Sequence, residues 1–149
     1  MPEPTTSEPT ASEAITLERV QELVARGPFH KWLGLKVVAV HDDAIELTAT
    51  WREEWVVNPD RGYTHGGVLA ALVDLAADWA MVRTTGRGVP TIDLRIDYHA
   101  AAMPGDLTAR GKVVRLGGQF STAEAYIYDG NGKLVASGRG TYFTAPPKP

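Results

Sequence analysis

The segment Gly66–Thr85, which reads GGVLAALVDLAADWAMVRTT, decides the fold of this chain. Its large apolar residues are spread around the whole circumference of a helix and are separated mostly by alanines. They are Val68, Leu69, Leu72, Val73, Leu75, Trp79, Met81 and Val82. A helix of about 30 Å that is apolar on nearly all sides is usually buried in the middle of a fold. The segment therefore predicts a long central helix that needs cover on most of its surface.

Strand-like runs surround this helix in the sequence. In residues 45–51 and 91–99 apolar and polar side chains alternate, as they do in strands that bury one face. Similar runs occupy residues 35–40, 107–116, 120–128 and 134–143, and the turn signal DGNG separates the last two. An antiparallel sheet with one apolar face supplies the cover that the helix needs. We therefore expect an α+β fold, in which an antiparallel sheet of about six strands wraps around the central helix.

A shorter helix is predicted near the N-terminus. Apolar residues recur at helical spacing between residues 15 and 24, Thr16 is a suitable N-cap, and a glycine-proline pair ends the pattern at residue 27. The residues that follow are expected to form a turn that packs Phe29, Trp32 and Leu33 on the body of the protein.

The length of 149 residues fits one domain, which we place at residues 14–144. Residues 1–13 are acidic and rich in proline, serine and threonine, and residues 145–149 are rich in proline, so both are expected to be disordered tails. No targeting signal is recognised, and the longest apolar run, at residues 68–73, is too short to span a membrane. Cytoplasmic residence is therefore the expectation.

Composition excludes several kinds of chemistry. The chain has no cysteine, which removes disulfides, thiolate zinc sites and cysteine nucleophiles. A net charge of −3 argues against electrostatic binding to nucleic acid. The four histidines lack metal-ligand spacing, and no serine stands in a Gly-x-Ser-x-Gly nucleophile motif, so neither a metal nor a cofactor is expected.

Asp74 is unusual because it lies in the middle of the apolar helix, with alanines and Asp78 one turn away. A buried carboxylate without a partner is costly, so it needs a partner, a raised pKa or a function. The two aspartates could also mark an ordinary solvated stripe. The helix begins at His65-Gly66-Gly67, where amide groups without side chains beside them could donate to a ligand's carbonyl oxygen.

The spacing between these features leaves two arrangements open. Asp74 follows Gly66 by eight residues, or about 12 Å along a helix axis. Both groups can act on one carbonyl only if the chain enters the helix obliquely, or if two copies of the chain face each other.

The chain resembles the hotdog-fold acyl-CoA thioesterases of the PaaI-like group, which is related to the 4-hydroxybenzoyl-CoA thioesterases. The resemblance covers roughly residues 28–143. It rests on Asn58-Pro59, Gly62, the run HGGVLAALVD at residues 65–74, the run TIDLRIDY at residues 91–98, the corner Pro104-Gly105-Asp106 and the run GRGTYF at residues 138–143.

The resemblance implies a carboxylate-driven thioesterase that needs no cofactor. The Gly66 amide would polarise the thioester carbonyl, and Asp74 would act as nucleophile or general base. His65 would hold the loop, Thr91 would assist from the facing subunit, and Asn58 would position water or substrate. Relatives usually place that amide side chain six residues before the histidine, whereas Asn58 stands seven before it. The partners implied are an acyl-CoA and further copies of the chain, as a homodimer or a homotetramer.

Four further residues are candidates for substrate binding. Gly67 adjoins the helix entry, and Asp78 falls where one branch of the family has a hydroxyl group. Arg95 and Arg115 lie on strands and could receive CoA phosphates. Two other functions remain open: an enoyl-CoA hydratase or dehydratase on the same fold, and a non-catalytic module that binds acyl thioesters.

Overall fold

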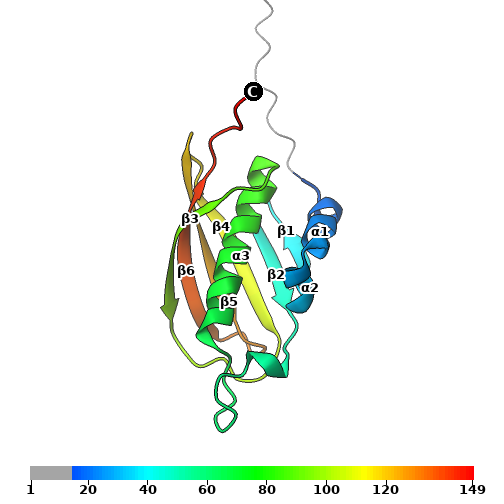
Figure 1. Cartoon of the computed structure of the whole chain (residues 1–149), viewed down its shortest axis with the longest axis vertical. Helices are drawn as coiled ribbons and strands as arrows, with labels where there is room; N and C mark the ends of the chain where they lie inside the picture. Colours follow the sequence, from blue (N-terminus) through cyan, green and yellow to red (C-terminus); the bar gives the residue numbers. More distant parts are fainter. Residues whose placement is uncertain (1–14) are drawn as a thin grey trace, which may run out of the picture.

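The computed structural model describes residues 15–149, and its elements follow the predicted order (Figure 1). The helices are α1 (Leu17–Arg26), α2 (Pro28–Trp32), η1 (Glu53–Trp55, a 3-10 helix) and α3 (Gly66–Thr85). The strands are β1 (Lys36–Val40), β2 (Ala44–Ala49), β3 (Thr91–Tyr98), β4 (Leu107–Arg115), β5 (Phe120–Tyr128) and β6 (Leu134–Phe143). The expected N-terminal tail, residues 1–13, lies outside the described residues, and residues 144–149 contain no helix or strand.

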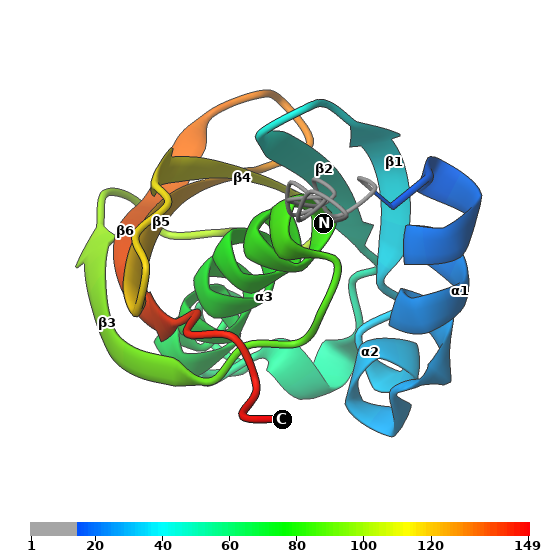
Figure 2. The same ribbon diagram turned by 90° about the horizontal axis from the view of Figure 1, so that it is seen from above.

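The six strands form one antiparallel sheet with the order β1-β2-β4-β5-β6-β3. The sheet curves around α3, and α1 and α2 lie beside β1 (Figure 2). Strand β3 follows α3 in the sequence but pairs with β6, so it forms the edge opposite β1. This arrangement confirms the predicted α+β hotdog architecture, with its central helix and its additional N-terminal helix.

The core lies between α3 and the concave face of the sheet. Buried side chains on that face include Ile45, Leu47, Ala109, Ala125 and Ile127. The helix lies directly against β4 at Gly111, where a Cβ atom would lie 1.9 Å from the carbonyl oxygen of Ala76. Because no side chain fits in that space, the residue at this point of β4 must be glycine.

The short helices cover one flank of this core. Helix α1 begins as predicted, since the Thr16 hydroxyl oxygen accepts a hydrogen bond from the amide of Arg19 at 3.2 Å. Leu33, just after α2, is fully buried, but Phe29 and Trp32 are 51% and 38% exposed. The expectation that both aromatic rings pack on the body was therefore wrong. They stack on each other at the surface instead, and the guanidinium of Arg52 lies over the Trp32 ring.

Strand β3 departs from the simple alternating pattern. Alternation predicts that Ile92, Leu94, Ile96 and Tyr98 share a buried face, yet Ile92 and Tyr98 are 57% and 56% exposed. An edge strand is covered on fewer sides than a central one, so apolar side chains at its two ends remain exposed.

No helix within residues 15–149 combines the length and the apolar character of a membrane span.

Candidate active site

The carboxylate of Asp74 is held through one of its two oxygens. The hydroxyl of Thr91 donates to Asp74 Oδ1 at 3.0 Å, and the hydroxyl of Tyr142 donates to the same oxygen at 3.1 Å. Within residues 15–149, no group donates a hydrogen bond to Asp74 Oδ2. The side chain is thus fixed in orientation while its second oxygen stays available for chemistry.

A β-bulge brings Thr91 to this position. The register between β3 and β6 shifts between Thr91 and Asp93, so Ile92 is the extra residue. Without the bulge, Thr91 would point to the same side as Asp93 and Arg95, away from α3. Bulges often turn a side chain toward a functional site in this way. The resemblance implied help from the facing subunit, whereas here the Thr91 hydroxyl contacts the aspartate of its own chain.

Tyr142 is the second donor and is fully buried in β6. Burial, and then the neighbouring Asp74, raise the pKa of its phenol above the ordinary value, so the group remains a donor. Its ring occupies the space next to Gly140, where a Cβ atom would lie 2.5 Å from the Tyr142 hydroxyl oxygen. Sequence reasoning did not single out Tyr142. A buried tyrosine needs a partner for its hydroxyl, but that partner is 68 residues away in the sequence.

Asp78 lies one helical turn beyond Asp74. Burial, with a smaller contribution from the Asp74 charge, raises the pKa of Asp78 to about 7 from an ordinary 3.8. Its Oδ1 atom is buried and has no hydrogen-bond partner in the part of the chain that the structure describes. The solvated-stripe interpretation therefore does not hold for Asp78. This carboxyl group keeps its proton at pH values well above those at which an ordinary aspartate has lost it.

The start of α3 is capped by its own histidine. His65 is the N-cap, and its ring Nδ1 accepts a hydrogen bond from the amide of Gly67 at 2.8 Å. In this arrangement Nδ1 is the unprotonated ring nitrogen. The Gly67 amide is thereby occupied, whereas the Gly66 amide meets no acceptor among residues 15–149. Of the two glycines, Gly66 is the one whose amide can donate to a ligand.

Gly66 also adjoins a surface cavity of about 400 Å³, whose walls include Leu69, Tyr98 and His99. The Tyr98 hydroxyl donates to the Gly66 carbonyl oxygen at 2.9 Å, and its ring lies 3.2 Å from where a side chain on Gly66 would begin. A side chain on Gly66 would need this exposed ring to shift by only a few tenths of an ångström. The cavity gives a ligand access to the start of the helix.

Gly66 and Asp74 do not meet within one chain. Helix α3 is continuous from Gly66, so Asp74 lies about 12 Å further along its axis. The oblique entry left open by the sequence is absent, because the helix begins at Gly66 itself.

Asn58 lies in the loop between η1 and α3, which the bridge between Val56 and Thr64 closes. Its side-chain oxygen accepts a hydrogen bond from the amide of Asp60 at 3.0 Å, and its carbonyl oxygen accepts from the amide of Gly62. The side-chain oxygen of Asn58 thus stabilises a local turn and makes no contact with Asp74.

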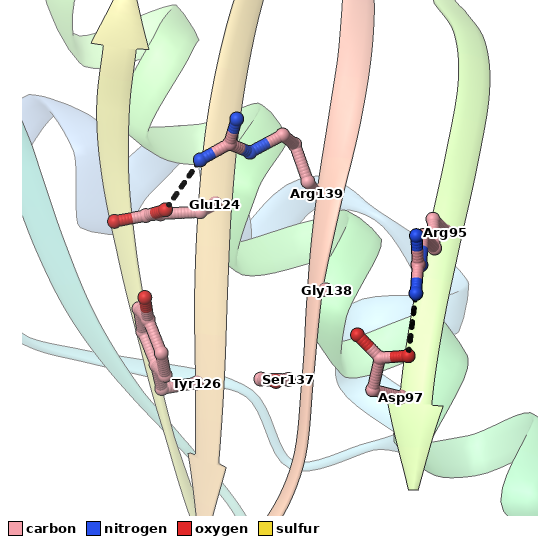
Figure 3. Close-up of a pocket in the computed structure, with 7 residues that line it drawn as sticks. All are labelled: Arg95, Asp97, Glu124, Tyr126, Ser137, Gly138 and Arg139. Carbon is pink, nitrogen blue, oxygen red and sulfur yellow. Dashed lines mark hydrogen bonds and ion pairs between the residues drawn. The ribbon is translucent and has the colours of Figure 1, made fainter.

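Arg95 lies on the face of the sheet that points away from α3 (Figure 3). It pairs with Asp97 at 3.4 Å beside a second ion pair, Arg139 with Glu124. Arg115, at the end of β4, is exposed. Within one chain, the structure therefore separates Arg95 from Asp74, and no contact joins Arg115 to Asp74.

Among residues 15–149, no group of three or more His, Asp or Glu side chains is suited to hold a metal ion.

Comparisons with known proteins agree with this fold. The model of the Thioesterase superfamily matches residues 61–136. A crystal structure of a protein from the thioesterase superfamily is 47% identical, with a TM-score of 0.83, and the match covers 85% of this chain and 96% of that one. A crystal structure of thioesterase HI1161 from Haemophilus influenzae is 25% identical, with a TM-score of 0.77 and coverage of 89% and 92%. The medium/long-chain acyl-CoA thioesterase YigI of Salmonella typhimurium is 26% identical over 88% of this chain and 97% of its own length.

Proposed function

Because this chain belongs to the thioesterase superfamily, we propose that it is an acyl-CoA thioesterase in which Asp74 drives hydrolysis to a free acid and CoA. One observation carries the role of Asp74: Thr91 and Tyr142 hold one carboxylate oxygen and leave the other free. The name of the Salmonella relative supports acyl-CoA as the substrate.

In a general-base route, Asp74 Oδ2 takes a proton from a water molecule as the water oxygen attacks the thioester carbonyl carbon. The carbonyl oxygen becomes an oxyanion, which the Gly66 amide and the partial positive charge at the start of α3 stabilise. Collapse of the tetrahedral intermediate breaks the C–S bond, and the leaving thiolate of CoA takes up the proton from Asp74.

In a nucleophilic route, Asp74 Oδ2 attacks the carbonyl carbon itself and expels the CoA thiolate. Water then hydrolyses the resulting mixed anhydride and restores the carboxylate. Both routes use the free oxygen of Asp74 and neither needs a metal or a cofactor. Thr91 and Tyr142 are positioning residues in both, and His65 stabilises the helix entry that presents Gly66.

We propose that the site is completed by a second copy of the chain. The distance of about 12 Å between Gly66 and Asp74 prevents them from acting on one carbonyl within a protomer. The outer edge of β3 has no paired strand among residues 15–149, and Ile92 and Tyr98 are exposed there. Pairing of two β3 edges would give a symmetric homodimer that covers these side chains. The family resemblance adds a homotetramer as a larger assembly of two such dimers.

The test is release of free thiol from a panel of aryl, short, medium and long acyl-CoAs by the wild type and by Asp74→Asn. We expect kcat of the variant to fall at least about a hundredfold on every substrate that the wild type hydrolyses. The fold should persist, because the asparagine side-chain oxygen can still accept from Thr91 and Tyr142. Asp42→Asn, in the exposed turn before β2, is the matched control and should keep wild-type rates.

Unchanged kcat for Asp74→Asn across the panel would contradict the proposed role of the carboxylate. Free thiol also separates hydrolysis from hydration of an enoyl-CoA, which leaves the thioester intact. Binding of acyl-CoA without thiol release from any substrate would instead indicate a non-catalytic module.

A further inference from the structure

A second cavity, of about 620 Å³, lies between α1 and the C-terminal half of α3. This volume is within the range of small-molecule sites, which is about 300–1,000 Å³. Its apolar wall includes Leu23 from α1 and Trp79 and Val82 from α3. No role in catalysis accounts for this cavity, which is separate from the one beside Gly66.

The cavity lies close to the candidate active site along α3. Asp78 belongs to the cavity wall and follows Asp74 by one helical turn, about 6 Å along α3. An acyl group that runs along α3 from a carbonyl carbon at Asp74, past Asp78 and over Trp79, would reach this cavity. The acyl group would thereby enter a space with an apolar wall.

The charged side chains of the cavity are mainly cationic. Arg19, Arg26 and Arg87 all line it, and Asp78 is its one acidic residue. Arg19 is paired with Glu22 at 2.7 Å, and Arg87 donates to the carbonyl oxygen of Thr144, which leaves its positive charge uncompensated. Arg26 has no hydrogen-bond or ion-pair partner within the described part of the chain.

This excess of positive charge is unusual for a protein with a net charge of −3. Because Asp78 holds its proton more strongly than an ordinary aspartate, it offsets little of that charge below neutral pH. An apolar wall with arginines at the rim is complementary to a molecule that has an apolar middle and an anionic end.

We propose that this cavity receives the acyl group of the substrate and selects acyl groups that end in a carboxylate, so that the preferred substrates are CoA thioesters of dicarboxylic acids. The inference rests on the proposed thioesterase function. The hydrocarbon part of the acyl group would contact Trp79 and Val82, and the terminal carboxylate would pair with Arg26, with Arg87 as the second cation.

The experiment compares matched substrates by thiol release. Glutaryl-, adipyl- and suberyl-CoA are assayed beside pentanoyl-, hexanoyl- and octanoyl-CoA, which have the same chain lengths without the terminal carboxylate. We expect kcat/KM of the wild type to be about tenfold higher for the best dicarboxylic substrate than for its neutral counterpart, as one charge-assisted hydrogen bond supplies.

Arg26→Gln should remove most of this preference and leave kcat/KM of the neutral substrates within about twofold. Arg139→Gln, an arginine on the opposite face of the sheet, is the control for loss of one positive charge and should change neither series. Thermal unfolding of both variants checks that the fold is intact.

Three results would overturn the proposal. Equal kcat/KM for the two series in the wild type would show that the terminal carboxylate is not recognised. An equal loss on both series in Arg26→Gln would place the arginine against the CoA phosphates instead. Thiol release from neutral substrates alone would refute the acyl selectivity and leave the thioesterase proposal standing, whereas no release from any acyl-CoA would refute the thioesterase proposal itself.

Discussion

At Asp74 the two carboxylate oxygens have different surroundings, because Thr91 and Tyr142 both donate to Oδ1 and none of residues 15–149 donates to Oδ2. The two donors hold the carboxylate in one orientation and leave Oδ2 free to meet a reacting atom. The buried phenol is the more constrained donor, since Tyr142 has no exposed surface.

Tyr142→Phe should lower kcat about tenfold and leave KM within about twofold, because the change removes a hydrogen bond to a charged group and no contact with substrate. Steady-state kinetics of thiol release measure this split. Thr91→Val removes the other donor to the same oxygen and should behave alike, whereas Thr91→Ser keeps a hydroxyl and should restore the rate. A rise in KM with unchanged kcat would contradict the positioning role.

Asp78→Asn tests the buried acid next to Asp74. Because burial raises the pKa of Asp78 to about 7 from 3.8, the folded protein binds a proton between these values that the unfolded chain has released. The stability of the wild type should therefore fall as pH rises from about 4 to about 7 and change no further on this account above pH 7.

Asparagine does not ionise, so Asp78→Asn should gain stability over the wild type across that interval. Three pKa units at about 1.4 kcal/mol each set an upper bound of about 4 kcal/mol on the gain at pH 8. Urea unfolding of both proteins at pH 4.5 and pH 8 gives the difference directly. A difference that is the same at both values would show that Asp78 titrates as an exposed carboxylate does.

Helix α3 and strand β4 pack at the distance that a glycine allows, and this contact sets where the helix lies in the curved sheet. Gly111→Ala should destabilise the protein by about 3 kcal/mol, because the new Cβ would fall 1.9 Å from the Ala76 carbonyl oxygen and force the helix or the strand to move. Thermal or chemical unfolding measures the loss. Gly118→Ala is the control, since a Cβ there meets nothing within 4 Å. Equal stability of the two variants would contradict the close packing.

The sequence predicted these elements well where their periodicity is uninterrupted. The bounds of α3, β5 and β6 agree with the expected ranges, because a helix of mostly apolar residues and strands with alternating side chains carry their signal locally. Strand β3 is different. Its bulge at Ile92 breaks the alternation and turns Thr91 toward Asp74, and a one-residue shift of register leaves no mark in the local composition.

The whole protein is proposed to act as a pair of chains, and subunit mixing can test this directly. Asp74→Asn lacks the proposed carboxylate, and Gly66→Pro lacks the proposed amide donor at a helix position that tolerates proline. Each homodimer should be inactive. In a mixed dimer, one of the two sites combines Gly66 of one chain with Asp74 of the other, so that site is intact.

Random exchange of the two variants makes half of the dimers mixed, and each has one intact site of two. We therefore expect about a quarter of wild-type activity after mixing and subunit exchange. Light scattering of the wild type should give a mass of about 32 kDa or a multiple of it, since the chain has 16.1 kDa. If the mixture stays inactive although mixed dimers form, Gly66 and Asp74 do not share a site across the interface.

The sequence by itself determined the central helix, the strands, and the placing of Asp74 and of the Gly66 entry on one helix, because these depend on residues close together in the chain. The tertiary structure alone decided which groups surround Asp74. Tyr142 lies 68 residues from it and Thr91 lies 17 residues from it, and the sheet brings both to the same oxygen. It also decided that His65 occupies the Gly67 amide and leaves the Gly66 amide free, because a side chain's choice between neighbouring donors depends on its three-dimensional orientation.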